Sequence, residues 1–169
     1  MKEVMANSFS NDTYIFDTKL TKLKEFCERR VADYVKEVIN PQKELDFYIT
    51  QSWLNITKPG QFHHQHSHPN SIISGVFYVT TVENDQIIFH DPNTKVKQIL
   101  QLDPTATSNA FNSDVFIGVK TLDLLLFPSW LEHSVKPNEA QSTDRISISF
   151  NTFVRGTIGI KEGLTELQL

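Results

Sequence analysis

The feature that most constrains this chain is a series of short β-branched and aromatic segments that begins after Pro41. Clusters of turn-forming residues at 58–60, 83–85, 91–93 and 136–138 separate these segments. Such segments, without helical patterns between them, predict a sandwich or barrel rather than parallel βαβ units. A jelly roll is one way for the strands to close, so we expect a mainly β fold. The predicted strands cover residues 47–50, 52–57, 72–81, 86–90, 96–102, 115–120, 122–127, 145–154 and 157–160.

A single amphipathic helix is predicted ahead of the strands, over residues 17–40. Asp17 or Thr18 can cap its start, and Asn40-Pro41 ends it. Charged residues occupy the opposite face, so we expect the helix to lie on an apolar surface. Its apolar side chains recur mostly three or four positions apart, at Leu20, Leu23, Phe26, Cys27, Val31, Tyr34, Val35 and Val38.

Length and composition indicate one domain. The chain has 169 residues, of which 39% are hydrophobic, and this is enough for a core of its own. We expect residues 1–169 to form a single domain, with 1–45 as an N-terminal arm and supporting helix and 46–160 as a jelly-roll core. Within the arm, Phe9 and residues 14–16 predict a short strand or a docked segment.

Charge and the lack of targeting signals favour a cytoplasmic protein. Lys and Arg number 16 against 20 Asp and Glu, and this net charge of −4 disfavours nucleic acid or an anionic membrane as a partner. No apolar run approaches the roughly 18 residues that a membrane span needs, and the N-terminus lacks the apolar core of a secretory signal. The single cysteine, Cys27, excludes an internal disulfide and a Cys-based zinc cluster, and its place on the helix stripe indicates a structural thiol.

A histidine cluster is the first candidate for chemistry. His63, His64, His66 and His68 lie within six residues, and imidazole is a common metal ligand. Because successive side chains of a strand alternate, we expect His64, His66 and His68 to share one face and His63 to point the other way. A His-x-His pair can supply two adjacent ligands, and a third must come from elsewhere in the chain.

His133 is the obvious third ligand, because it follows a buried apolar strand that ends near residue 128. Farther along, Arg145, Ser147, Ser149 and Asn151 alternate with apolar residues, so these polar side chains share one face of a strand. If that face points into the barrel, the arginine needs an anion, and its planar fork pairs best with a carboxylate.

Each of these features has an ordinary explanation when taken alone. A histidine cluster on a loop can be a solvated patch, a lone histidine such as His133 is usually structural, and a strand arginine is usually an exposed charge. Their combination in this order on an all-β frame favours a metal site with an anionic co-substrate.

The order and spacing resemble the iron(II)- and 2-oxoglutarate-dependent dioxygenases, and more narrowly a small 2-oxoglutarate-Fe(II) oxygenase family of bacteria and phage. The similar blocks lie within residues 60–78, 127–135 and 145–151, and the resemblance covers roughly residues 50–155. It implies a double-stranded β-helix, which is a jelly roll of the cupin-like kind, with one or two flanking N-terminal helices. That expectation agrees with the fold predicted from the strand pattern.

The resemblance implies that His66, His68 and His133 bind Fe(II), while Arg145 and Ser147 hold the far carboxylate of the co-substrate 2-oxoglutarate. The implied reaction is hydroxylation of a substrate that the sequence does not identify. One departure matters, because His68 stands where the usual facial triad has a carboxylate, which leaves the site one unit more positive.

Three alternatives therefore stay open. In the first, His68 does not bind the metal and a carboxylate such as that of Asp91 takes its place. A 2-oxoglutarate-independent enzyme resembling the three-histidine thiol dioxygenases is the second, with Arg145 holding the substrate's own carboxylate. A non-catalytic, cupin-like metal-binding module is the third.

Several further residues are candidates for the surroundings of the metal. Asn55 is expected to hydrogen-bond the co-substrate, and Trp53, on the same face, to belong to the core. The candidates for the second shell or the substrate pocket are His64, Ser74, Tyr78, Trp130 and Asn151, with Phe127 and Trp130 expected to wall the pocket.

Substrate choice is expected to depend on loops. We predict that residues 1–16, 103–114 and 136–144 contribute, with the loop after Asp103 as a lid. The substrate is expected to be a small molecule or a peptidyl group, and a homo-oligomer is compatible with the sequence.

Overall fold

The computed structural model describes residues 8–92 and 114–169, and all that follows concerns these residues. The helical elements are α1 (Ile15–Thr18), α2 (Thr21–Tyr34) and the π-helix η1 (Val35–Ile39). The strands are β1 (Ser8–Phe9), β2 (Asp46–Thr57), β3 (His63–His66), β4 (Ile73–Thr80), β5 (Gln86–His90), β6 (Asp114–Gly118), β7 (Leu124–Pro128), β8 (His133–Val135), β9 (Arg145–Arg155), β10 (Thr157–Ile158) and β11 (Leu167–Gln168).

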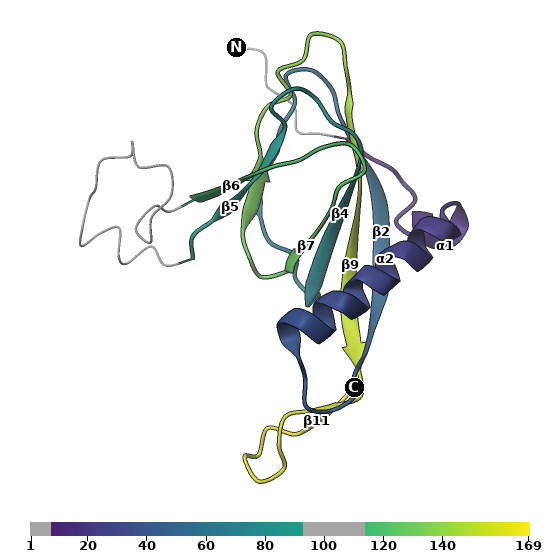
Figure 1. Ribbon diagram of the computed structural model, residues 1–169, viewed down its shortest axis with the longest axis vertical. Coiled ribbons are helices and arrows are strands. Elements are labelled where there is room, and N and C mark those ends of the chain that lie inside the picture. The colour runs from purple at the N-terminus through teal and green to yellow at the C-terminus, as the bar shows by residue number, and fades with distance from the viewer. Residues whose placement is uncertain (1–7, 93–113) are drawn as a thin grey trace, which may run out of the picture.

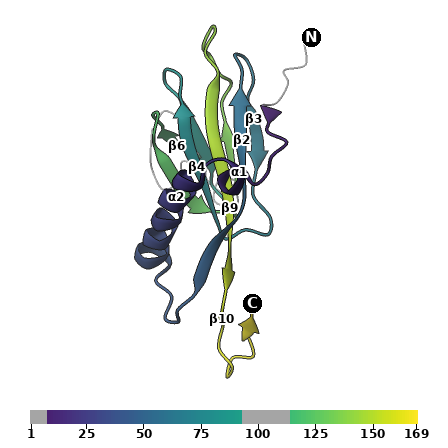
Figure 2. The same cartoon turned by 90° about the vertical axis from the view of Figure 1, so that its right-hand side faces the viewer.

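Two antiparallel sheets form the body of the protein (Figure 1). One has five strands in the order β1-β2-β9-β4-β7, and the other has four in the order β3-β8-β5-β6. Every pair of neighbouring strands in them is antiparallel. The mainly β, jelly-roll architecture expected from the sequence is therefore confirmed. A small hairpin of β10 and β11 extends away from the sheets at the C-terminal end (Figures 1 and 2).

The helical segment covers one face of the five-stranded sheet (Figure 2). Phe16 of α1 and Val31 of α2 pack with Ile148 and Phe150 of β9 in one buried cluster. The Phe16 and Phe150 rings lie 5.5 Å apart and both are fully buried. This packing uses the apolar half of the β9 alternation and leaves its polar half for the other face of the sheet.

Cys27 belongs to the same cluster and is fully buried. Burial raises the pKa of its thiol to about 12, so the reactive thiolate is not formed at neutral pH. The expected structural role of this cysteine agrees with its position.

The helix predicted over 17–40 is interrupted. The chain makes the short helix α1, leaves helical geometry at Lys19 and Leu20, and starts again at Thr21. The predicted end is confirmed, because Asn40 takes a left-handed conformation with φ of 46° directly before Pro41. Phe9 lies in the short strand β1, whereas residues 15 and 16 start α1 and are docked against the sheet with their side chains buried.

Several predicted strands differ from the observed ones in their bounds, and two of these differences concern β2 and β7. The predicted segments 47–50 and 52–57 form one strand, β2, with a register shift between Ile49 and Gln51. The segment predicted from 122 begins at Leu124, because Leu122 has a φ of 75° in a turn. The strand predicted over 96–102 and most of the lid predicted after Asp103 lie outside the described residues.

Within residues 8–92 and 114–169, no helix combines the length and the apolar character needed to cross a membrane.

Gly75 is expected to tolerate no side chain. It pairs with Phe150 across β4 and β9, and a Cβ built on Gly75 would overlap the Phe150 ring, which is fully buried. We expect Gly75→Ala to lower the free energy of unfolding by about 1–3 kcal/mol through overpacking. The measurement is urea denaturation followed by circular dichroism.

Gly118→Ala is the matched control, because a Cβ at Gly118 meets no atom within 4 Å. It is expected to change the free energy of unfolding by no more than about 0.5 kcal/mol. Equal stability of the two variants would contradict the packing described for Phe150.

Candidate metal centre

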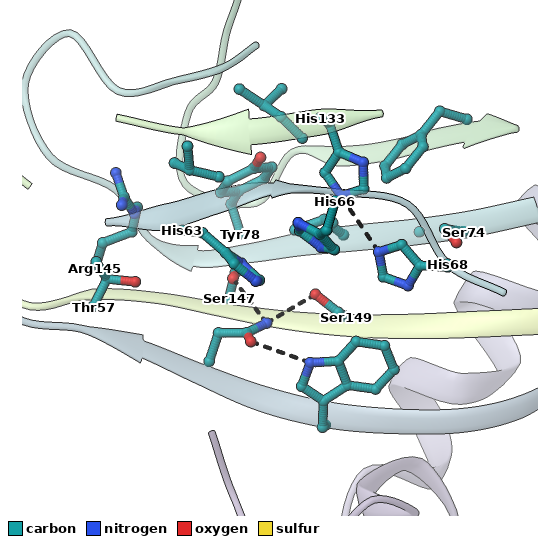
Figure 3. A pocket seen from close by; sticks show the side chains of 17 residues that line it. Thr57, His63, His66, His68, Ser74, Tyr78, His133, Arg145, Ser147 and Ser149 are labelled. Atoms are coloured by element: carbon teal, nitrogen blue, oxygen red, sulfur yellow. Dashed lines mark hydrogen bonds between the residues drawn. The ribbon is translucent and has the colours of Figure 1, made fainter. Parts of the chain in front are cut away.

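A cavity between the two sheets holds most of the predicted site residues (Figure 3). Strands β2, β4, β7 and β9 line it from the five-stranded sheet, and β3, β5 and β8 line it from the other. The polar row of β9 faces it, because Arg145, Ser147 and Ser149 all contribute to its wall. The alternation predicted for this strand is therefore confirmed at these three positions.

Three histidines meet at one end of the cavity. His66 lies on β3 and pairs in register with His133 on β8, while His68 follows β3 in the chain. Each offers a ring nitrogen, and these nitrogens all lie within 4.8 Å of one another. Figure 3 shows the three rings close to one another, from β3, the segment after it, and β8.

Hydrogen bonds to carbonyl groups set the tautomers of two of these rings. His133 Nδ1 lies 3.0 Å from the carbonyl oxygen of Leu131, and His66 Nδ1 lies 2.8 Å from that of His64. Because a carbonyl only accepts, each Nδ1 must carry the proton and donate it. The Nε2 lone pair of each ring is then free for a metal ion, an arrangement that is typical of metal-binding histidines.

Burial keeps the three rings in the form that binds metal. Burial lowers the pKa of His133 to about 3 and that of His68 to about 4, and it lowers the pKa of His66 as well. All three are therefore neutral at physiological pH, and neutral imidazole is the ligand form.

The spacing of the nitrogens fits a shared ion. His68 Nε2 and His133 Nε2 are 3.3 Å apart. Two nitrogens bound about 2.0–2.1 Å from one metal at angles of about 90–109° would lie roughly 2.8–3.4 Å apart. Among the described residues, no carboxylate belongs to this cluster, so Asp91 is not a member of it.

A β-bulge changes which histidines face the cavity. The pairing of β3 with β8 shifts register between His63 and His66, so these two side chains lie on the same side. His63 lines the cavity with its ring stacked 4.2 Å from that of His66, and the prediction that it points away is wrong. The His64 side chain is exposed, and this residue acts on the site through its carbonyl group. Strict alternation fails here because a bulge inserts an extra residue into one strand.

Trp53 contributes to the wall of the site rather than only to the core. Its ring stacks on that of His68 with centroids 5.9 Å apart, and its indole N–H donates to Asn55 Oδ1 at 3.1 Å. Asn55 is buried and donates through Nδ2 to Ser149 Oγ at 2.8 Å. Ser147 Oγ lies 3.5 Å from the same Nδ2, so these groups form one network along the cavity floor.

Ser74 and Asn151 lie behind His68. Ser74 is buried and donates to Asn151 Oδ1 at 2.9 Å. The Asn151 side chain in turn forms a hydrogen bond with His68. Asn151 thus contacts the histidine cluster, while Ser74 lines the same cavity and reaches the cluster through Asn151.

The aromatic candidates divide into two groups. Phe127 is buried and meets the His133 ring edge-on at 4.7 Å, and Tyr78 lines the cavity with a pKa that burial raises. Trp130 does not line the cavity and is 65% exposed, so the prediction that it walls the pocket is wrong. The chain turns outward directly after β7, which ends at Pro128, and carries the indole to the surface.

Arg145 already holds a carboxylate that the sequence analysis missed. Its Nη1 donates to Asp85 Oδ1 at 2.8 Å, and its Nη2 donates to the carbonyl oxygen of Lys136 at 3.1 Å. The Arg145 and Asp85 side chains are 5% and 1% exposed. Asp85 stands in a turn between β4 and β5, directly after Asn84 with φ of 57°. In the sequence it was part of a turn signal, and nothing local distinguishes it from an exposed turn aspartate.

A family model described as "Putative 2OG-Fe(II) oxygenase" matches residues 51–151, which is more than half of the chain. The matched segment contains His66, His68, His133, Arg145 and Ser147. No curated protein is similar enough to the chain to count as a match.

Solved structures share the fold at low sequence identity. HygX from Streptomyces hygroscopicus with iron bound is 9% identical, with a TM-score of 0.58 over 89% of this chain and 73% of that chain. The non-heme alpha ketoglutarate dependent epimerase SnoN from nogalamycin biosynthesis is 11% identical, with a TM-score of 0.62 over 90% of this chain and 65% of that chain. An oxidoreductase of the 2OG-Fe(II) oxygenase family from Burkholderia pseudomallei is 11% identical, with a TM-score of 0.48 over 73% of this chain; this chain spans 56% of its length. The likeness to the first two establishes the fold alone.

The lowered histidine pKa values predict a pH-dependent stability of the metal-free protein. In the unfolded chain, His68 and His133 take up protons near the ordinary pKa of 6.5, whereas in the folded protein they resist protonation down to about pH 4 and 3. The unfolded state therefore binds more protons, and stability is lost as the pH falls below about 6.5. Urea midpoints at pH 7 and pH 5 measure this loss.

His133→Gln separates this effect from other acid titrations. The variant lacks one of the buried rings, so its urea midpoint should fall less between pH 7 and pH 5 than that of the wild type. An equal fall in both proteins would contradict the assignment.

Proposed function

Since this chain belongs to the 2OG-Fe(II) oxygenase family, we propose that it hydroxylates an organic substrate with molecular oxygen and 2-oxoglutarate. The observation that carries the proposal is the set of three neutral imidazoles aimed at one point inside a β-sandwich, with a buried arginine in the same cavity. Bound together, the metal and 2-oxoglutarate would supply the oxidising chemistry, and succinate and carbon dioxide would be the by-products.

We assign His66, His68 and His133 as the metal ligands. The Nε2 atoms of His66 and His133 carry free lone pairs, and a ring nitrogen of His68 lies close to them. The neutral state of the three rings and the spacing of these nitrogens fit one ion. The three rings alone would leave further coordination positions for the co-substrate and for oxygen. His68 here replaces the carboxylate of the common 2-His-1-carboxylate set.

Arg145 and Ser147 are proposed to bind the far carboxylate of 2-oxoglutarate, and Asn55 to assist. All three line the cavity that contains the histidines, and Arg145 lies away from His68 along it (Figure 3). A guanidinium has five N–H donors, so Arg145 can donate hydrogen bonds to a second carboxylate in addition to that of Asp85. Ser147 can add a hydroxyl donor from the same face of β9.

The substrate is proposed to reach the metal from an open groove of about 530 Å³ beside the cavity. The groove and the cavity share Trp53, His63, His66 and His68, so the histidine cluster lies between them. Apart from the histidines, the side chains that line the groove are uncharged, with Phe9 of the N-terminal arm among them. This lining suits a neutral small molecule or a peptidyl segment.

The protein's own contribution would be orientation and the exclusion of water. Phe127 and Ile87 present apolar surface to the cavity beside the histidines. The hydrogen bond of His133 to the Leu131 carbonyl holds its ring in place during turnover. A largely dry cavity protects a reactive oxidant from side reactions with water.

Succinate formation tests the function directly. The purified protein with Fe(II), ascorbate and 2-oxoglutarate is expected to consume oxygen and to form succinate slowly even without substrate. His133→Ala should abolish this activity. If no succinate forms and 2-oxoglutarate does not bind, the proposed function is wrong; oxygen uptake with cysteine-like thiols alone would favour the 2-oxoglutarate-independent alternative.

Metal affinity tests the ligand set. His68→Ala is expected to weaken Mn²⁺ or Zn²⁺ binding by at least about 10–100-fold, the loss typical of removing even an outer-shell partner. His68→Asp should retain tight binding, because a carboxylate ligand completes the usual triad.

His64→Ala is the matched control for the ligand variants. The side chain is exposed, and the carbonyl that fixes His66 belongs to the backbone, so the variant should bind metal like the wild type. Unchanged affinity in His68→Ala would remove His68 from the ligand set.

A further inference from the structure

The buried pair of Asp85 and Arg145 is the feature that the proposed function leaves unexplained. Both side chains are almost completely buried, and their closest atoms are 2.8 Å apart. Asp85 Oδ2, by contrast, is buried without a hydrogen-bond partner among the described residues. Asp85 does not line the cavity, but its side chain is hydrogen-bonded to Arg145, which does.

The role of the Asp85–Arg145 pair follows from the formal charges of the metal, the co-substrate and the side chains of the site. A divalent ion and the 2-oxoglutarate dianion cancel each other, and three neutral imidazoles add nothing. The guanidinium of Arg145 then leaves one positive charge in a buried site. In the common ligand set, the metal-bound carboxylate neutralises that charge, but here His68 has taken its place.

We propose that Asp85 is the resident counter-ion of Arg145 and supplies the negative charge that the histidine-only ligand set lacks. This proposal rests on the proposed function, since it assigns Arg145 to the far carboxylate of 2-oxoglutarate. Asp85 keeps the guanidinium paired while the co-substrate is absent, because a lone buried charge is strongly unfavourable. The co-substrate must therefore bind to an arginine whose charge is already matched, which weakens its attraction.

The variant Asp85→Asn tests the negative charge of Asp85 separately from the size and shape of its side chain. The asparagine Oδ1 can still accept the hydrogen bond from Arg145 Nη1, so the guanidinium stays in place. The new NH₂ group takes the position of Oδ2, which accepts no hydrogen bond from the described residues. The variant therefore removes one negative charge and keeps the hydrogen bond from Arg145 Nη1.

The first readout is binding of 2-oxoglutarate to the Mn²⁺-loaded protein by isothermal titration calorimetry. Asp85→Asn should bind the dianion more tightly by roughly three- to thirtyfold, because one like charge is removed from a site of low effective dielectric. The gain should be smaller for 2-oxobutyrate, which lacks the far carboxylate. Unchanged or weaker binding of 2-oxoglutarate, or an equal gain for both acids, would overturn the proposal.

Asp46→Asn is the matched control. Asp46 pairs with Arg155 at 3.1 Å, but both side chains are at least 60% exposed and lie outside the cavity. The control removes the same formal charge from an aspartate–arginine pair, and 2-oxoglutarate affinity should stay within twofold of the wild type.

The second readout is thermal unfolding without metal or co-substrate. Asp85→Asn should lower the melting temperature by on the order of 10 °C, because the positive charge of the buried Arg145 is left without a counter-ion. Adding Arg145→Met should recover much of this loss, and it also rescues the test if the single variant does not fold. A melting temperature equal to that of the wild type would overturn the counter-ion role.

The two readouts separate the two ideas. If the wild type binds no 2-oxoglutarate, the proposed function fails, while the melting temperatures still decide whether Asp85 serves as the counter-ion. If the wild type binds 2-oxoglutarate and Asp85→Asn binds it no better, only the present inference fails.

Discussion

The two-sided packing of β9 is the constraint on which the rest of the structure depends. This strand lies in the middle of the five-stranded sheet, with the helices packed on one of its faces and the cavity toward the second sheet on the other. Ile148 and Phe150 are buried under the helices, while Arg145, Ser147 and Ser149 line the cavity on the other face. One alternating sequence therefore builds the core and the polar floor of the site together, and a slip of one residue would exchange them.

Burial of uncharged rings is the second principle of this site. The imidazoles are removed from water, and burial lowers their pKa values, so they enter the cavity as neutral ligands. The same desolvation makes an isolated guanidinium unfavourable, and the carboxylate of Asp85 compensates the charge of Arg145. Metal ligands and ion pair are thus two consequences of one low-dielectric cavity.

Much of the candidate site could be predicted from sequence because its residues stand in regular strands. The facing of Arg145 and Ser147 followed from alternation, and the structure brings His66, His68 and His133 together as the pattern suggested. The prediction failed for His63 because a bulge breaks the alternation of β3, and for Trp130 because a turn carries it outward. Neither event has a local signal in the residue types.

What the sequence by itself determined is the class of fold and the face of each regular strand, because hydrophobic periodicity is a local property of consecutive residues. The pairing of β3 with β8, the bulge that turns His63 into the cavity and the pairing of Asp85 with Arg145 depend on the tertiary structure. These contacts join residues up to 72 positions apart. Their partners are chosen by the packing of two sheets and by the need to satisfy buried polar groups, and no short stretch of sequence encodes that choice.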